Sequence, residues 1–108
     1  MKIPIFTSQL EKSREAVDIS NARAAYAEIM TAALTNDTKC TDTDVTYNSS
    51  TKTWSEEVTL KQTQEGWTTD TTDIDIGGIG DIGTGTPTNG GKVTVSYNEE
   101  AGVTVAWE

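Results

Sequence analysis

The chain has 108 residues, which is enough for one domain with one modest core, and its net charge is −9. This charge argues against nucleic acid as a partner, because an acidic surface repels phosphate. Histidine is absent and Cys40 is the only cysteine, which excludes a disulfide within the chain and metal sites built on His or paired Cys. Because Cys40 has no histidine to activate it, we expect no enzymatic activity and no catalytic residues.

The first third of the chain predicts one helix, from about Thr7 to Leu34. This stretch contains neither Gly nor Pro, and alanine, the strongest helix former, is its commonest residue. Ser8 and Glu11 fit a capping box at its start, and residues 35–38 favour a turn at its end. Arg14 lies four residues before Asp18, a spacing that suits a surface ion pair.

Apolar residues divide this helix into two faces. Leu10, Val17 and Ala24 form a narrow stripe, and together with Arg14 they are the predicted assembly seam. The second half carries a broad apolar face on the opposite side. Glu11 and Glu15 fall in the same sector as that face, so we expect the first half to project from the domain, with a frayed first turn or two as the alternative. The predicted core between helix and sheet consists of Tyr26, Ile29, Met30, Leu34, Trp54 and Trp107.

Residues 36–108 predict an antiparallel sheet with long loops. Alternating apolar residues mark strands at 45–47, at 54–60 with Glu56 as an exception on the apolar face, and at 73–76. The clearest unit is a hairpin, with arms at 93–97 and 103–107 around a loop containing Gly102. Residues 77–91 form a Gly/Thr-rich loop. The predicted fold is therefore α+β: a helical part (1–35) packed on a small antiparallel β-sheet head (36–108), in one domain.

Four carboxylates near the Gly-rich loop are a weak calcium candidate: Asp70, Asp73, Asp75 and Asp81. Carboxylate and loop oxygens are the ligands that Ca²⁺ takes. Their spacing does not match an EF-hand loop, so a solvated acidic loop is the default interpretation. No other cofactor is expected.

Three segments within residues 3–34 resemble the type IV pilins and the type II secretion pseudopilins, and are closest to the versions from Gram-positive bacteria. They are Ile3-Pro4-Ile5, Ser13-Arg14-Glu15-Ala16 and Arg23-Ala24-Ala25-Tyr26. In this family an apolar N-terminal segment anchors the precursor in the membrane and continues into an Ala-rich helix that carries a β-sheet head. Ile3-Pro4-Ile5 matches the end of that segment. The rest of the segment and its processing motif are missing from this sequence, so we expect membrane contact only through the missing part.

This resemblance implies a structural subunit of a type IV pilus or pseudopilus filament, assembled through its N-terminal helix. The implied partners are copies of itself, other pilins and the pilus or secretion assembly machinery. The implied location is an extracellular filament on the cell surface, with the precursor anchored in the cytoplasmic membrane. The charge distribution agrees, because residues 1–35 are neutral and the whole −9 lies in residues 36–108.

The alternative function is a surface adhesion or carbohydrate-binding module on a pilin-like scaffold. Aromatic residues are typical platforms for sugars, and Tyr26, Trp54, Trp67 and Trp107 are the candidates. Packing of these rings between helix and sheet explains them more simply.

Overall fold

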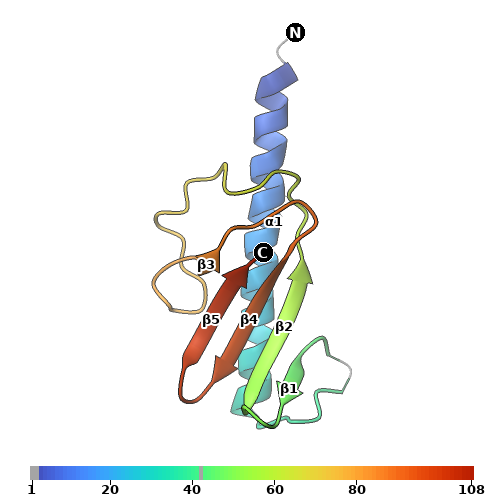
Figure 1. The fold of residues 1–108 in the computed structure, drawn as a ribbon, viewed down its shortest axis with the longest axis vertical. Coiled ribbons are helices and arrows are strands. Elements are labelled where there is room, and N and C mark those ends of the chain that lie inside the picture. Colours follow the sequence, from blue (N-terminus) through green and yellow to red (C-terminus); the bar gives the residue numbers. More distant parts are fainter. Residues whose placement is uncertain (1–2, 42) are drawn as a thin grey trace.

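The computed structural model describes residues 3–41 and 43–108, with the side chains of the helix described from residue 9 onward. One helix, α1 (Ile3–Leu34), packs along one face of a five-stranded sheet and extends past the sheet at its N-terminal end (Figure 1). The strands are β1 (Thr46–Asn48), β2 (Thr53–Thr59), β3 (Thr84–Gly85), β4 (Lys92–Asn98) and β5 (Gly102–Trp107), in the spatial order β1-β2-β4-β5-β3. The predicted α+β class is confirmed.

The two ends of α1 differ in how well the sequence predicts them. The helix begins at Ile3, so Ser8 lies inside it and the predicted capping box is wrong. Its end at Leu34 is as predicted. Asn36 adopts a left-handed conformation (φ 51°) and donates its N–H to Ala33, while Asp37 donates to Ala32. These two bonds form a Schellman motif, which satisfies carbonyls that the last helical turn leaves free.

The sheet is mixed, which corrects the prediction of a purely antiparallel one. The predicted hairpin is present as β4 and β5, with Val93 opposite Trp107 and Val95 opposite Val105. The exception is β3, which runs parallel to β5. Gly85 makes this close approach feasible, because its φ is 87° and a Cβ there would collide with the Trp107 carbonyl.

Residues 73–76 form no strand, so that prediction is also wrong, although Ile76 is buried and Asp75 exposed as the alternation indicates. The core lies between α1 and the inner face of the sheet. Its buried apolar members are Ile19, Ala22, Ala25, Ile29, Ala32, Val45, Trp54, Leu60, Ile76, Ile82, Val93, Val95, Val105 and Trp107.

Of the six predicted core residues, only Leu34 is misplaced. Ile29, Trp54 and Trp107 are buried, and Tyr26 and Met30 pack at the margin of the core. Leu34 is 82% exposed, because it lies about 140° around the helix from Ile29.

The inward face of α1 is buried well beyond its apolar half. Glu11, Glu15 and Asp18 are all fully buried. Their spacing of four and three residues continues without a break through Ala22, Ala25, Ile29 and Ala32. One continuous face is therefore buried from residue 11 to residue 32, and the prediction that the first half projects freely is wrong over this range.

We call the three buried acids Glu11, Glu15 and Asp18 the carboxylate ladder. They hold the irregular segment 60–69 against the helix. Each carboxylate accepts hydrogen bonds from two main-chain N–H groups, at N···O distances of 2.7–3.1 Å. The six donors belong to Lys61, Gln62, Thr63, Gln64, Thr68 and Thr69. Because this segment pairs with no strand, its N–H groups need these acceptors.

Local surroundings move the pKa values of two ladder residues in opposite directions. Burial acts to raise the pKa of Glu11, but hydrogen bonds from Thr63, Gln64 and Arg14 outweigh it and lower that pKa. Burial prevails at Asp18 and raises its pKa despite the two bonds that the carboxylate accepts. Arg14 contacts Glu11 at 3.3 Å and not the predicted Asp18, because Asp18 points inward.

We predict that Glu15→Gln destabilises the fold. The amide keeps one acceptor oxygen but turns an NH₂ donor towards the N–H of Thr68 or Thr69, leaving a buried donor without an acceptor. The free energy of unfolding should fall by about 1–3 kcal/mol, measured by urea denaturation. Lys12→Gln, at an exposed position of the same helix, is the control. Equal stability of the two variants would contradict the structural role of the ladder.

Candidate functional site

The outward face of α1 carries an uncovered stripe that runs the length of its described part. Every residue of this outer stripe is exposed, and the spacing alternates between three and four residues: Leu10, Ser13, Val17, Ser20, Ala24, Ala27, Thr31 and Leu34. Leu10 and Val17 are 52% and 46% exposed, whereas Ile29 is fully buried, as predicted. Apolar and small residues at this spacing are what a helix needs to pack closely along a second helix.

Three of the four residues of the predicted assembly seam lie on this stripe. Leu10, Val17 and Ala24 belong to it. Arg14 is half-buried and turned towards segment 60–69, where its guanidinium donates to Glu11 and to the hydroxyl of Thr63 at 3.2 Å.

An acidic groove borders the outer stripe where α1 meets the edge of β2. Its volume is about 450 Å³, and it is lined by Asn21, Ala24, Glu28, Asp44, Glu56, Glu57, Val58, Thr59 and Lys61. Ala24 belongs both to the groove and to the stripe, so the two surfaces are continuous.

Glu56 is the unusual residue of this groove. It stands on the core side of β2, opposite the buried Val95, and is 6% exposed. Its Oε1 accepts no hydrogen bond from the described residues. The pKa of Glu56 is raised to about 7, first by burial, then by the negative charge of Glu28 and a side-chain hydrogen bond with it, and last by the charge of Asp44. In contrast to the carboxylate ladder, this carboxyl lacks the donors that stabilise a buried charge.

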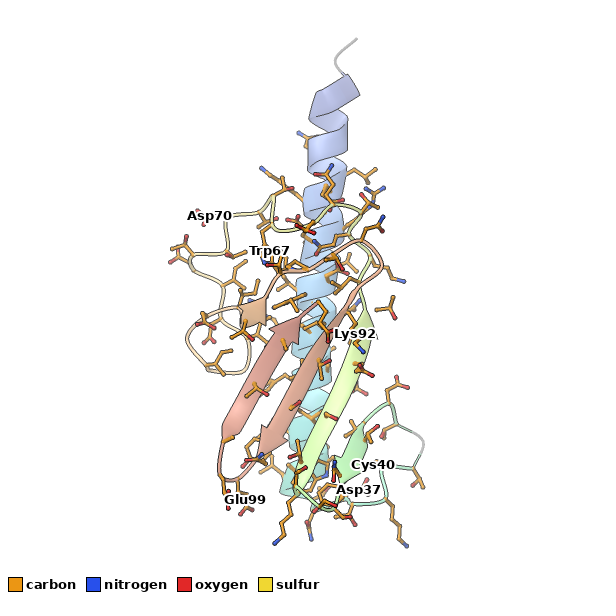
Figure 2. The ribbon with its side chains drawn as sticks, in the orientation of Figure 1. Asp37, Cys40, Trp67, Asp70, Lys92 and Glu99 are labelled. Carbon is orange, nitrogen blue, oxygen red and sulfur yellow. The ribbon has the colours of Figure 1, made fainter. Side chains whose placement is uncertain are left out.

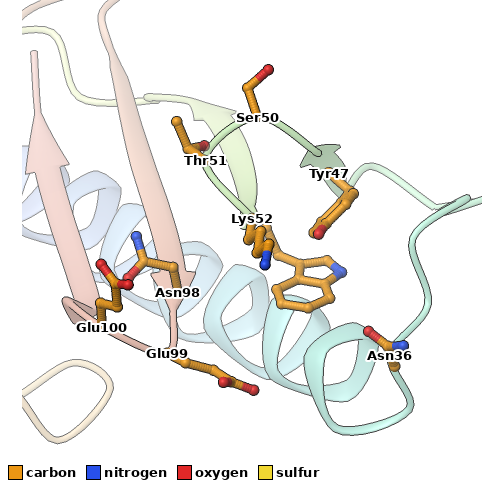
Figure 3. A pocket seen from close by; sticks show the side chains of 9 residues that line it. Asn36, Tyr47, Ser50, Thr51, Lys52, Asn98, Glu99 and Glu100 are labelled. Carbon is orange, nitrogen blue, oxygen red and sulfur yellow. The ribbon is translucent and has the colours of Figure 1, made fainter.

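A second hollow lies beside the C-terminal end of α1, between the loop that joins β1 to β2 and the loop that joins β4 to β5 (Figure 3). Its volume is about 730 Å³, and its lining is mainly polar: Asn36, Tyr47, Ser50, Thr51, Lys52, Trp54, Asn98, Glu99 and Glu100. We call it the distal pocket. The half-buried ring of Tyr47 packs against Trp54 in a tilted arrangement, at 4.7 Å between centroids and 47° between ring planes, and offers an aromatic surface there.

The predicted aromatic candidates serve mainly as packing groups. Trp54 and Trp107 are buried, and their indole N–H groups donate to the carbonyls of Asp37 and Ile82, both at 2.8 Å. Trp67 meets Trp107 edge to face at 4.8 Å. The hydrogen bonds to Asp37 and Ile82 satisfy the N–H groups of the two buried indoles.

The four calcium candidates do not converge. Asp70, Asp75 and Asp81 each accept a hydrogen bond from a main-chain N–H of their own loop, and Asp73 is exposed. Figure 2 shows Asp70 on the outer side of its loop. Within residues 3–41 and 43–108, no group of three or more Asp, Glu, Cys or His side chains is arranged to hold a metal ion.

Cys40 is half-buried next to the C-terminal end of α1. Its thiol lies 3.4 Å from the carbonyl of Asp37. Burial raises the pKa of Cys40, and the charge of Asp37 raises it further. Since the thiolate is the reactive form, these surroundings disfavour nucleophilic chemistry at this residue.

Comparisons with known proteins do not assign the chain to a class: no family model matches it, and no curated protein or solved structure does. Among the described residues, no helix is long and apolar enough to cross a lipid bilayer.

Two of these features are visible in the sequence only in part. Glu56 stands out as a charge on an apolar face, but its neighbour Glu28 is distant in sequence and joins it only through the fold. Glu11 and Glu15 lie in the sector of the apolar face of α1, and their spacing to Ala22 is the signal that predicts their burial.

We predict that the carboxyl of Glu56 makes the fold less stable as pH rises. Its pKa is higher in the folded chain than in the unfolded one, so its stabilising contribution is present below about pH 4.5 and lost as pH passes through about 7. Glu28, Asp44, Glu57 and Lys61 are the charged groups around it. Glu56→Gln should therefore raise the free energy of unfolding at pH 8 by at most about 3 kcal/mol and change it little at pH 4.

Thermal unfolding at both pH values measures this difference. Glu57→Gln is the matched control, because Glu57 is the next residue of β2 but is exposed. The prediction is wrong if Glu56→Gln behaves like Glu57→Gln at pH 8.

Proposed function

We propose that this chain is a structural subunit that assembles side by side with copies of itself through the outer stripe of α1. The observation that carries the proposal is the stripe, a row of eight exposed residues at helix-packing spacing. The charge of the chain supports it, since residues 1–35 are neutral and do not repel a second copy, while residues 36–108 carry the −9.

The finer proposal is a type IV pilus or pseudopilus filament, and it rests on the resemblance of the three helical segments. In such a filament the helices pack together inside and the sheets lie outside. A helix of 32 residues, about 48 Å long, with its sheet on one side and a packing stripe on the other suits this arrangement. Other pilins, the assembly machinery and a membrane-anchored precursor at the cell surface belong to this proposal. Imaging cells that express the full-length gene with its assembly machinery, for filaments that contain this chain, tests it directly.

Val17→Asp should abolish self-association without unfolding the chain. Val17 is exposed, so a carboxylate there costs little in the monomer but is desolvated between packed helices. Thr104→Asp introduces the same charge at an exposed position of β5 and is the control. Sedimentation equilibrium at up to millimolar concentration should show weak association of the parent chain and of Thr104→Asp, and monomers of Val17→Asp. A parent chain that stays monomeric throughout contradicts packing through the stripe.

The distal pocket favours a second candidate, the adhesion or carbohydrate-binding module. Amide, hydroxyl and charged groups surround the Tyr47 ring in this hollow (Figure 3). Polar groups around an aromatic surface suit the alternating faces of a sugar.

If the distal pocket binds sugars, neutral oligosaccharides such as cellotetraose should change the fluorescence of Trp54 at millimolar concentration. Tyr47→Ala should remove this response, because it deletes the aromatic surface. Tyr26→Phe, which alters an aromatic residue outside the pocket, should keep it. A response that survives Tyr47→Ala, or no response from the parent chain, argues against the pocket as a sugar site.

A further inference from the structure

The acidic groove holds an unusual concentration of negative charge with few donors. Glu28, Asp44, Glu56 and Glu57 line it together with one cation, Lys61, and Glu56 is more than nine-tenths buried. The Oε1 atom of Glu56 accepts no hydrogen bond from the described residues. A buried acceptor in this state is costly unless a donor reaches it. The groove therefore fits a cationic group that donates hydrogen bonds.

The outer stripe indicates where such a group would come from. With Leu10 and Val17 as the a positions of a heptad repeat, Glu28 takes an e position and Arg23 a g position. The two residues lie on opposite flanks of the stripe, and both are exposed. When two such helices pack in parallel, a g residue of one faces the e residue of the next heptad on the other. Arg23 and Glu28 have this relation.

Arg23 has the chemistry that the groove needs. Its guanidinium has five N–H donors in a planar fork and suits paired carboxylates better than a lysine does. One of them makes a long bond of 3.4 Å to the Asp75 carbonyl at the exposed edge of the head. This bond holds the side chain beside the stripe and uses only part of its donor capacity.

We infer that the acidic groove is the docking site for Arg23 of a second copy of this chain, packed in parallel along the outer stripe. Arg23 of each copy would bridge Glu28 and Glu56 of the other, so that two such contacts form within each parallel pair of helices. This inference rests on the proposed self-association. It adds that the two helices run parallel and that Arg23, Glu28 and Glu56 determine how the copies pair.

Charge reversal tests the pairing. Arg23→Glu and Glu28→Arg should each weaken self-association about tenfold or more, since like charges then meet at every contact. An equimolar mixture of the two variants should restore association to near the parent level. In the mixture the introduced glutamate of one variant faces the introduced arginine of the other, and the native Arg23 faces the native Glu28. Sedimentation equilibrium of each variant and of the mixture measures this. Circular dichroism melts should show that both variants unfold cooperatively and no less stably than the parent chain by more than about 1 kcal/mol, because both positions are exposed.

The outcomes separate the pairing from the association itself. If single reversals leave association intact while Val17→Asp abolishes it, the stripe packs but Arg23 does not dock in the groove. If both single variants are weak and the mixture stays weak, the two residues do not face each other, and the inference is wrong. If neither the parent chain nor any variant associates, the proposed function and this inference fail together. Arg23→Gln and Glu28→Gln, which remove charge without reversing it, should give intermediate weakening. Their mixture should repair it only in part, because each mixed pair regains one of the two Arg23–Glu28 contacts.

Discussion

The fold depends on the burial of three carboxylates on one face of a helix. Each carboxylate removed from water loses strong hydration, which is recovered only if hydrogen-bond donors replace it. Segment 60–69 supplies six such donors from its main chain, and it needs acceptors because no strand pairs with it. Neither partner is stable at this place alone. The ladder therefore fixes both the path of the chain between β2 and the Gly-rich loop and the length of helix that the head covers.

The ladder also separates the two faces of α1. Because Glu11, Glu15 and Asp18 continue the line of Ala22 and Ile29, the helix turns one unbroken face inward. The opposite face is left without charged residues along its stripe, since the acids that would otherwise occupy the surface of the first half are internal. The first half of α1 thereby combines a polar attachment to its own head with an outward face suited to a second helix.

Residue patterns predicted those parts of the fold that follow from local periodicity. Strict alternation located β4 and β5, and the broad apolar sector located Ile29. Long-range hydrogen bonding is not predictable in the same way. Segment 60–69 has no regular spacing of apolar residues, and its hydrogen-bond partners on α1 lie about fifty residues earlier in the sequence. Glu11 and Glu15 were assigned to solvent by residue type although their spacing indicated the buried face. Glu56 was visible as an exception, but the groove around it required the fold.

The two groups of buried acids show how donors decide the state of a carboxyl. At Glu11, hydrogen bonds outweigh burial and the pKa falls, whereas at Glu56 burial and neighbouring charges act together and the pKa rises to about 7. Both side chains are buried, so the difference lies in the supply of donors at Glu11 and in the neighbouring negative charges at Glu56. The carboxylate ladder receives its hydrogen-bond donors from its own chain. The groove at Glu56 opens to the surface beside the outer stripe, so a second helix packed on that stripe would place its side-chain donors next to the groove.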